Sequence, residues 1–481
     1  MSDDKKQTQP NVGRRDFLRR AGAVVGTAGI MGTAASSNAS DTGKGRLAPE
    51  YDYDAIVVGG GFAGVTAARE LRHDGKKTLL LEARNRLGGR TFYGEFAGHK
   101  LDFGGTWIHW SQPFVWAEKE RYGLDITETP GAVAPDRLYI KVGDETVEAG
   151  TDDVVAAVSA FDLYVSEGRQ IMERPYDASH QWNEVLRADA MTATDRMNQL
   201  ELTDLQRVVL DNIISTTAHS NADTISYFET IRYFGLGAFS YAPFMEAIAR
   251  YKFKHGTKSL IDKMVEDGSP EVRLSTPVNR IEDLGDKVRI TTVRGDEITA
   301  GVVVAALPMN TIADIEFSPE LHPALVEAAT ERHAGQGFKV FIKARGRLGN
   351  VMSISDSISP IQLLFTYEEA DDHTLLVGFG SGQNGLDLYD TEALEAEIAK
   401  LIPGVEIEST FSYDWVLDPY SKGTWCSYRP GWAARYYEQF NSDSGRVYFA
   451  QGDHGEGWRG TIDGAIGAGL RAAERIRGDH A

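Results

Sequence analysis

The sequence predicts a mixed α/β fold that combines a Rossmann-like unit with a helical region and further strands. Three observations predict it: an apolar strand–turn–helix pattern that starts after residue 50, a block of helical pattern at 150–251, and short β-branched runs from residue 273 onward. The chain has 481 residues, 42% of them hydrophobic and 25% charged, so a globular protein with a large core is expected.

Net charge and cysteine content exclude several classes of function. The formal net charge of −20 argues against nucleic acid or anionic lipid as a partner. Cys426 is the only cysteine, which excludes an internal disulfide framework and any metal site that needs several cysteines. No His, Cys and Asp residues have the spacing of a metal site, so no metal is expected.

The first 40 residues are expected to be a twin-arginine signal peptide. Arg14 and Arg15 precede an apolar stretch at 21–35, and small residues follow at 37–39. The stretch is too short and too weakly apolar for stable insertion in a membrane. Export of the folded protein to the periplasm is therefore expected, with a linker at 41–50; the alternative is a disordered basic tail.

The next residues predict a strand–helix–strand unit. Residues 53–58 (YDAIVV) predict a buried parallel strand, 65–71 (VTAAREL) a helix with small residues on one face, and 77–81 (KTLLL) a second strand. Glu82 ends that strand 18 residues after Gly64, close to the spacing expected of an acid that holds ribose hydroxyls.

The turn after the first strand has the glycines that a dinucleotide requires. Gly59 permits the tight turn, Gly61 lets the backbone approach a pyrophosphate, and Gly64 lets the helix pack close to the strand. Phe62 and Ala63 begin the helix, whose free N–H groups and dipole favour phosphate. We therefore predict that this turn binds a dinucleotide.

A second glycine pair argues against a nicotinamide dinucleotide as the cofactor. In residues 82–91 (EARNRLGGRT) the acidic strand end leads into a glycine turn with a flanking arginine, which suits a pyrophosphate clamp. Nicotinamide dehydrogenases do not usually place such an element there. Ala83, Arg84, Gly89 and Arg90 are accordingly predicted to contact the cofactor.

Several motifs together resemble the flavin-containing monoamine oxidase family. They are the EAR-x-R-x-GGR stretch, FGGTW at 103–107, YFAQGD at 448–453 and GWRGTIDGA at 457–465, in an order and at distances suited to one FAD. Within that family, residues 104–113 and 413–430 resemble the nicotine-catabolic branch, nearer to bacterial pseudooxynicotine amine oxidases than to nicotine oxidoreductases.

The resemblance implies the amine oxidase fold, with a discontinuous FAD-binding domain of the GR2 type and a substrate domain of helices plus a sheet. The expected FAD-binding segments are 51–132, 253–312 and 418–481, and the expected substrate-binding segments are 133–252 and 313–417. It also implies further residues at the cofactor: Thr106, Trp107, Val278, Gly452, Asp453, Thr461 and Ile462.

The reaction implied by the resemblance is oxidation of a neutral amine. A hydride leaves the carbon next to nitrogen for flavin N5, and the imine hydrolyses to an aldehyde and a smaller amine. The expected substrate is a secondary alkylamine such as pseudooxynicotine, and the expected electron acceptor is O2 or a periplasmic carrier such as a cytochrome c. A homodimer is also compatible with the sequence.

Three residues match catalytic positions of the family. Lys339 matches the lysine that holds a water near N5, Trp425 one wall of the aromatic cage, and Thr461 the second wall, which is commonly aromatic. Trp425 and Thr461, together with Trp110, are also expected to contact substrate. The alternative for Lys339 is an outward position on an edge strand.

Two further positions bear on the chemistry. The cysteine that carries covalent flavin in mammalian relatives should fall at Thr424, so FAD is expected to be non-covalent. His109 is either a general base or a hydrogen-bonded structural histidine.

The remaining segments predict the frame around the site. Residues 200–214 predict a helix with Thr203 as its cap, and the aromatic-rich stretch 228–244 either lines a pocket or belongs to the core. Strands are predicted at 273–281, 288–293 and 302–306, and five more, forming one wall of a substrate site, at 339–345, 351–355, 362–367, 374–378 and 406–413.

Two other functions stay open at this stage. A polyamine or amino-acid oxidase would share the fold, although an amino-acid oxidase needs a pocket arginine for the carboxylate, which the sequence does not locate. A flavin-binding carrier without catalytic turnover would share the cofactor motifs but would not be reduced by an amine.

Overall fold

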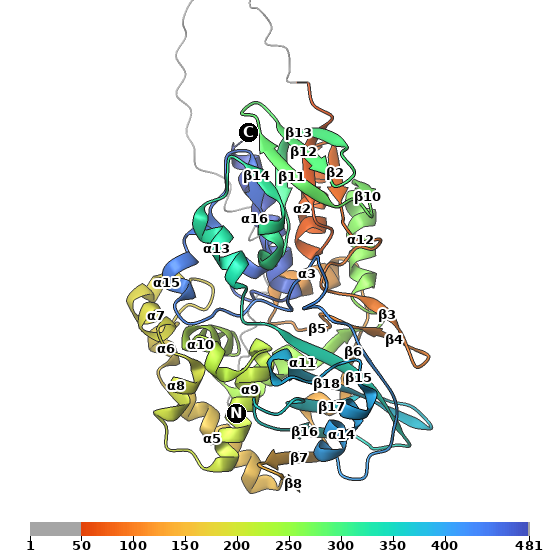
Figure 1. Ribbon diagram of the computed structural model, residues 1–481, viewed down its shortest axis with the longest axis vertical. Coiled ribbons are helices and arrows are strands. Elements are labelled where there is room, and N and C mark those ends of the chain that lie inside the picture. The colour runs from red at the N-terminus through yellow and green to blue at the C-terminus, as the bar shows by residue number, and fades with distance from the viewer. Residues whose placement is uncertain (1–49, 480–481) are drawn as a thin grey trace, which may run out of the picture. The chain divides into compact units, whose positions relative to one another are not determined.

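Two large β-sheets organise residues 50–479, the part of the chain that this computed structural model describes (Figure 1). The predicted signal peptide and most of the predicted linker lie outside the described residues. The larger sheet has the order β10-β2-β1-β13-β12-β11-β14, with β20 paired to β13. Its strands are β1 (Tyr53–Val58), β2 (Thr78–Leu81), β10 (Glu271–Arg273), β11 (Val278–Asp283), β12 (Val288–Thr292), β13 (Glu297–Ala305), β14 (Glu316–Ser318) and β20 (Val447–Phe449).

The core of this sheet is the predicted parallel unit. Strand β1 pairs in parallel with β2 on one side and with β13 on the other. Its residues Ala55, Ile56 and Val57 are completely buried, as expected of a parallel strand covered on both faces.

The glycine turn after β1 takes the predicted form. Gly59 has φ +109°, and a Cβ on Gly64 would lie 1.9 Å from the Gly59 carbonyl oxygen. Helix α2 (Phe62–His73) therefore starts directly against the strand. The other helices near this sheet are α3 (Pro113–Arg121), α12 (Lys258–Gly268) and α16 (Ile462–Asp479), and Figure 1 shows α16 and α12 beside α2.

The second sheet has the order β19-β15-β18-β17-β16-β7-β8. The five strands predicted after residue 338 are confirmed, and β7 and β8, which precede the helical region, extend the sheet. Neighbours are antiparallel except for β16 and β7. The strands are β7 (Arg137–Val142), β8 (Glu145–Glu148), β15 (Gly337–Arg345), β16 (Val351–Ile354), β17 (Leu363–Glu369), β18 (His373–Ser381) and β19 (Ile407–Ser412).

The helical region lies beside this sheet in Figure 1, as the pattern at 150–251 predicts. In α9 the Thr203 hydroxyl accepts the Gln206 N–H at 3.3 Å, so the predicted cap is confirmed, although the helix starts at Asp204 and not at Leu200. The helices are α5 (Thr151–Tyr164), α6 (Gly168–Ile171), α7 (Trp182–Asp189), α8 (Ala193–Asn198), α9 (Asp204–Ala218), α10 (Tyr227–Leu236) and α11 (Tyr241–Ala249).

One strand prediction is wrong. The run 273–281 is not one strand, because β10 ends at Arg273 and β11 starts at Val278. Between them Ser275 takes a left-handed φ of 52° and Pro277 has no N–H to donate, so the ladder cannot continue. The two strands then pair with different neighbours, β10 with β2 and β11 with β12.

Smaller elements complete the fold. None of the helices in residues 50–479 has the length and hydrophobicity of a membrane span. The small sheets consist of β3 (Tyr93–Phe96) with β4 (His99–Asp102), and of β5 (Trp107–Ile108), β9 (Tyr251–Phe253) and β6 (Ile126–Glu128). The other helices are α4 (Pro130–Val133), α13 (Pro323–Glu331), α14 (Thr391–Leu401) and α15 (Trp432–Tyr436), and the 3-10 helices are η1 (Ala178–Gln181), η2 (Ala222–Thr224), η3 (Met309–Asp314), η4 (Gly382–Asn384), η5 (Gln439–Asn441) and η6 (Gly452–His454).

Candidate active site and cofactor site

A cavity of about 670 Å³ brings together residues of both large sheets and of helices α2, α9, α11 and α16. Its size is that of a site for small molecules. Most predicted site residues line it: Gly59, Gly61, Phe62, Ala63, Glu82, Ala83, Arg84, Gly89, Arg90, Thr106, Trp107, Val278, Lys339, Trp425, Gly452, Thr461 and Ile462.

Glu82 lines the cavity, and the residue is 3% exposed. Its Oε2 accepts the Gly60 N–H at 2.7 Å and its Oε1 accepts the Arg84 N–H at 2.8 Å. Each oxygen keeps a lone pair for a further donor, such as a ribose hydroxyl. This arrangement fits the predicted role of Glu82.

The two glycine turns meet backbone to backbone. A Cβ on Gly89 would lie 3.2 Å from the Gly61 Cα, so side chains here would crowd the space that the cofactor needs. The first residues of α2 and α16, Phe62 and Ile462, line the same cavity. Two helix N-termini directed at one cavity favour an anionic ligand, and these residues fit the pyrophosphate and flavin of FAD.

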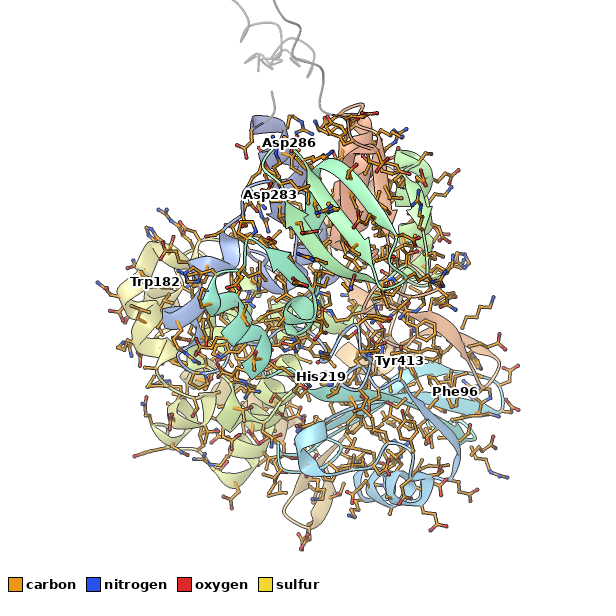
Figure 2. All side chains as sticks on the ribbon, turned by 45° about the horizontal axis from the view of Figure 1, so that its top comes forward. Phe96, Trp182, His219, Asp283, Asp286 and Tyr413 are labelled. Atoms are coloured by element: carbon orange, nitrogen blue, oxygen red, sulfur yellow. The ribbon has the colours of Figure 1, made fainter. Side chains whose placement is uncertain are left out.

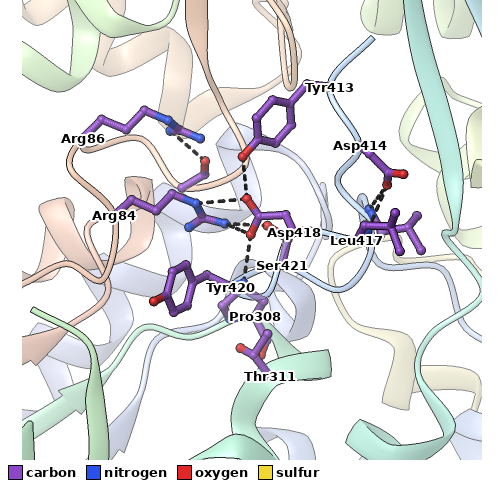
Figure 3. A network of polar contacts seen from close by, with 12 residues as sticks. Arg84, Arg86, Pro308, Thr311, Tyr413, Asp414, Leu417, Asp418, Tyr420 and Ser421 are labelled. Carbon is purple, nitrogen blue, oxygen red and sulfur yellow. Dashed lines mark hydrogen bonds and ion pairs between the residues drawn. The ribbon is translucent and has the colours of Figure 1, made fainter. Parts of the chain in front are cut away.

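The guanidinium of Arg84 is bound within the chain (Figure 3). It lies 2.5 Å from Asp418 and donates to the Ser421 hydroxyl at 2.8 Å, while the Tyr413 hydroxyl donates to Asp418 at 2.6 Å. Burial would raise the pKa of Asp418, but the Tyr413 hydrogen bond and the Arg84 charge lower it overall. Arg84 therefore joins the end of β2 to the loop around residue 418.

Arg90 is held from two sides. It forms an ion pair with Asp453 at 2.7 Å and donates to the Thr424 carbonyl at 2.6 Å. Asp453 is completely buried and does not line the cavity. Burial would raise its pKa, but Arg90 lowers it overall, so the carboxylate stays ionised and holds Arg90 in place.

Lys339 points inward from β15 and is 5% exposed, so the alternative of an outward position on an edge strand does not hold. Its ammonium donates to the carbonyls of Asp102 and Gly104 at 2.7 and 3.1 Å and to the Thr106 hydroxyl at 2.7 Å. Burial lowers its pKa below the ordinary lysine value. All three N–H groups of the ammonium therefore have partners in the chain, and none is left for the predicted water. A lysine that gives up its proton more readily at a cavity wall is suited to moving a proton there.

Trp425 lies at the cavity wall with its face covered on one side by a histidine. Its ring stacks on His219 with centroids 4.1 Å apart and an interplanar angle of 5°. Thr461 also lines the cavity, but its hydroxyl donates to the Trp458 carbonyl at 2.7 Å. Thr461 can therefore accept a hydrogen bond from a ligand but has no proton left to donate.

Besides Asp453, two predicted positions do not line the cavity. Trp110 is 61% exposed and does not line the cavity, so the structure does not bring it together with Trp425 and Thr461. Gly64 packs against Gly59 behind the lining, as its role requires.

His109, weighed as a general base, is also outside the lining. It is 2% exposed, and its Nδ1 lies 2.9 Å from the Ser111 hydroxyl. This placement favours the structural alternative.

The aromatic stretch 228–244 has both of its predicted roles. Tyr233 and Tyr241 line the cavity, whereas Phe228, Phe234 and Phe244 are completely buried in the core. The part of the lining contributed by α9, α11 and the second sheet, called the apolar end below, is mostly apolar. It includes Val209, Ile213, Tyr241, Met245, Met352, Ile354, Phe365 and Phe379.

His219 is a cavity residue that the sequence did not predict. It follows α9 as an isolated histidine with no motif around it, so no local signal marks it. Figure 2 labels it in the interior, and it is 1% exposed.

Among residues 50–479, no group of three His, Cys, Asp or Glu side chains could hold a metal ion.

Comparisons with known proteins agree with this geometry. The profile of the family described as flavin containing amine oxidoreductase matches residues 62–477. A pseudooxynicotine dehydrogenase of a Pseudomonas species is 42% identical, over 99% of this chain and 98% of that protein. A nicotine dehydrogenase of Pseudomonas putida is 36% identical, over 98% and 99% of the two chains.

A solved putrescine oxidase with putrescine bound shares the fold. It has a TM-score of 0.76 at 21% identity and covers 89% of this chain and 99% of that one.

Proposed function

The chain belongs to the flavin containing amine oxidoreductase family, and on this premise we propose that it oxidises pseudooxynicotine or a similar secondary alkylamine. The protein is an FAD-dependent enzyme that acts on small amines. The products of the proposed reaction are an aldehyde and a smaller amine, formed when the imine is hydrolysed. Bound FAD supplies the group that accepts a hydride from the carbon next to nitrogen.

One observation carries the proposal: Lys339, Trp425 and Thr461 line one cavity together with the apolar walls contributed by α9, α11 and the second sheet. Apolar walls exclude water and lower the pKa of a buried amine, which favours the neutral form that can lose a hydride. The indole face of Trp425 tolerates the positive charge that develops on nitrogen as the hydride leaves.

The lining also separates the amine classes. Arg84 and Arg90 line the cavity, but they are bound to Asp418 and Asp453. No arginine belongs to the apolar end within residues 50–479, so a substrate carboxylate would be buried there without a partner. This disfavours amino acids, and the 42% identical pseudooxynicotine dehydrogenase supports a secondary alkylamine.

The experiment is product analysis with a panel of amines. Purified enzyme is incubated with pseudooxynicotine, nicotine, putrescine and leucine, and the carbonyl and amine products are identified by mass spectrometry. We expect an aldehyde and methylamine from pseudooxynicotine at the highest kcat/KM. A higher kcat/KM for putrescine or leucine would contradict the proposed substrate.

We also propose that the enzyme works in the periplasm after export through a twin-arginine signal. The support is the pair Arg14 and Arg15 ahead of an apolar stretch that ends in small residues. Replacing both arginines by lysine should leave active, FAD-loaded enzyme in the cytoplasm. Unchanged delivery to the periplasm would contradict this assignment.

The electron acceptor is O2 or a periplasmic redox protein. Mixing anaerobically reduced enzyme with O2 in one experiment and with oxidised cytochrome c in another measures both reoxidation rates directly. The faster acceptor at physiological concentration identifies the enzyme as an oxidase or a dehydrogenase.

A further inference from the structure

The end of helix α9 holds the segment that carries Trp425. The Trp425 indole N–H donates to the Thr217 carbonyl at 2.8 Å, and the Ser427 hydroxyl donates to the Ala218 carbonyl at 2.9 Å. The last carbonyls of a helix have no partner inside it and need one elsewhere. The segment at 425–427 therefore supplies the donors that finish α9, and α9 in turn fixes this segment.

His219, the residue that follows the last residue of α9, fixes the orientation of the Trp425 ring. The two rings lie parallel, with an interplanar angle of 5° and centroids 4.1 Å apart. One hydrogen bond at the indole N–H anchors one edge of the ring but still allows the ring plane to tilt by small rotations about the Cα–Cβ and Cβ–Cγ bonds. A second ring against its face restricts these rotations, so the plane of Trp425 depends on His219.

The position of His219 is itself determined by several independent contacts. Its backbone is left-handed with φ 56°, a conformation that is uncommon for residues other than glycine and that surrounding contacts stabilise here. A Cβ on Gly337 would lie 2.3 Å from the His219 Cδ2, so this glycine leaves room for the ring. These features keep the imidazole where it meets the Trp425 face.

Both ring nitrogens of His219 have partners. Nε2 lies 2.8 Å from the Phe338 carbonyl, which can only accept, so Nε2 carries the proton. Nδ1 then accepts from the Thr424 hydroxyl at 2.9 Å. Burial lowers the pKa of His219 to about 4, so the ring is neutral at pH 7. The histidine thus joins three parts of the cavity: the end of α9, the strand that carries Lys339, and the residue next to Trp425.

We propose that His219 is a positioning residue that sets the plane of the Trp425 ring in the amine cavity and thereby determines which amines the enzyme prefers. This inference rests on the proposed function, in which Trp425 flanks the amine nitrogen. His219 acts through Trp425 and also lines the cavity close to it. Removing it should alter the geometry of amine binding while the FAD contacts stay in place.

The test uses His219→Asn in the FAD-loaded enzyme. Asparagine tolerates the left-handed backbone, so the turn keeps its shape while the stacked ring is lost. Flavin reduction is followed anaerobically by stopped-flow absorbance with a secondary amine and with its primary-amine analogue. We expect unchanged FAD content and a ratio of the two reduction efficiencies that changes roughly 10- to 200-fold. The matched control is His109→Gln, which alters another buried, stacked histidine that lies outside the cavity.

A double-mutant cycle with Trp425→Ala separates positioning from a general structural effect. If His219 acts through the indole, His219→Asn should have no further effect on the amine ratio once Trp425 is alanine. An equal effect in both backgrounds, or no effect in either, would overturn the inference. If His219→Asn does not fold, Thr424→Val removes the hydroxyl that donates to Nδ1 and should shift the ratio in the same direction by less.

These outcomes are distinct from failure of the proposed function. If no amine reduces the wild-type flavin, the proposed function is wrong. If the wild type is reduced and the variants show the wild-type amine ratio, only the role of His219 is wrong.

Discussion

Replacing Lys339 by methionine should slow a flavin step without releasing FAD. The ammonium of Lys339 donates three hydrogen bonds, to the carbonyls of Asp102 and Gly104 and to the Thr106 hydroxyl. Methionine has a similar length and needs no partner, so it can fill the space between β15 and the segment after β4. The glycine turns and Glu82 are not touched, so FAD should stay bound.

The size of the kinetic effect follows from the contacts. A hydrogen bond from a charged donor contributes about 1.5–3 kcal/mol, and each 1.36 kcal/mol changes a rate tenfold. Loss of one such interaction in the transition state should therefore slow reduction or reoxidation by roughly 10- to 150-fold. Anaerobic stopped-flow absorbance measures the reduction by amine, and mixing with the acceptor measures the reoxidation. If both rates stay within about twofold of the wild type, the catalytic role of Lys339 is refuted.

The same variant has a consequence for stability. Because burial lowers the pKa of Lys339, the unfolded chain binds this proton more tightly than the folded chain. The stability linked to this group is present above the unfolded lysine pKa near 10.5 and is lost as pH falls through the folded pKa. Between pH 7.5 and pH 10 the wild type should therefore gain stability relative to Lys339→Met, by at most about 1.4 kcal/mol per pH unit. Chemical unfolding across this range measures the difference, and identical slopes would contradict a lowered pKa.

Three further predictions concern the cofactor. Glu82→Ala should weaken FAD retention on dilution far more than it alters amine selectivity, because the buried carboxylate lies beside the glycine turn; full flavin occupancy would exclude the assigned role. Asp418→Asn should speed FAD dissociation by roughly tenfold or less, because Arg84 and Tyr413 keep only a neutral partner in a buried site. A wild-type release rate in a fluorescence assay would exclude a role of the Arg84–Asp418 pair in holding FAD (Figure 3). Acid or denaturant should release the flavin, since Thr424 carries no thiol; flavin that stays with the chain in denaturing electrophoresis would show a covalent link.

The parts that the sequence could predict are those set by local rules. The turn from Gly59 to Gly64 and the cap at Thr203 depend on backbone conformation and on neighbours a few residues away, so their residue types are visible in the sequence. The buried strands are visible for the same reason, as uninterrupted apolar runs. The break after Arg273 was missed because a polar stretch that ends in Pro277 can lie inside an edge strand or interrupt one, and only the pairing partners decide.

The contacts that complete the site could not be predicted, because they join distant segments. His219 and Thr424 are 205 residues apart in the sequence, and Arg84 and Asp418 are 334 residues apart. The sequence around each of these residues therefore contains no pattern that identifies its partner. Trp110 shows the opposite error. It is predicted to contact substrate, but β5 ends at Ile108 and the chain then turns, which leaves Trp110 exposed.

The central claim is that the apolar end of the cavity presents a secondary alkylamine to FAD. The most direct measurement is anaerobic mixing of wild-type enzyme with excess pseudooxynicotine, followed as loss of the oxidised-flavin absorbance. The account predicts complete bleaching in a single turnover, and a strongly slowed reaction in Trp425→Ala with its FAD still bound. Flavin that stays oxidised in the wild type, or a Trp425→Ala variant that bleaches at the wild-type rate, would contradict it.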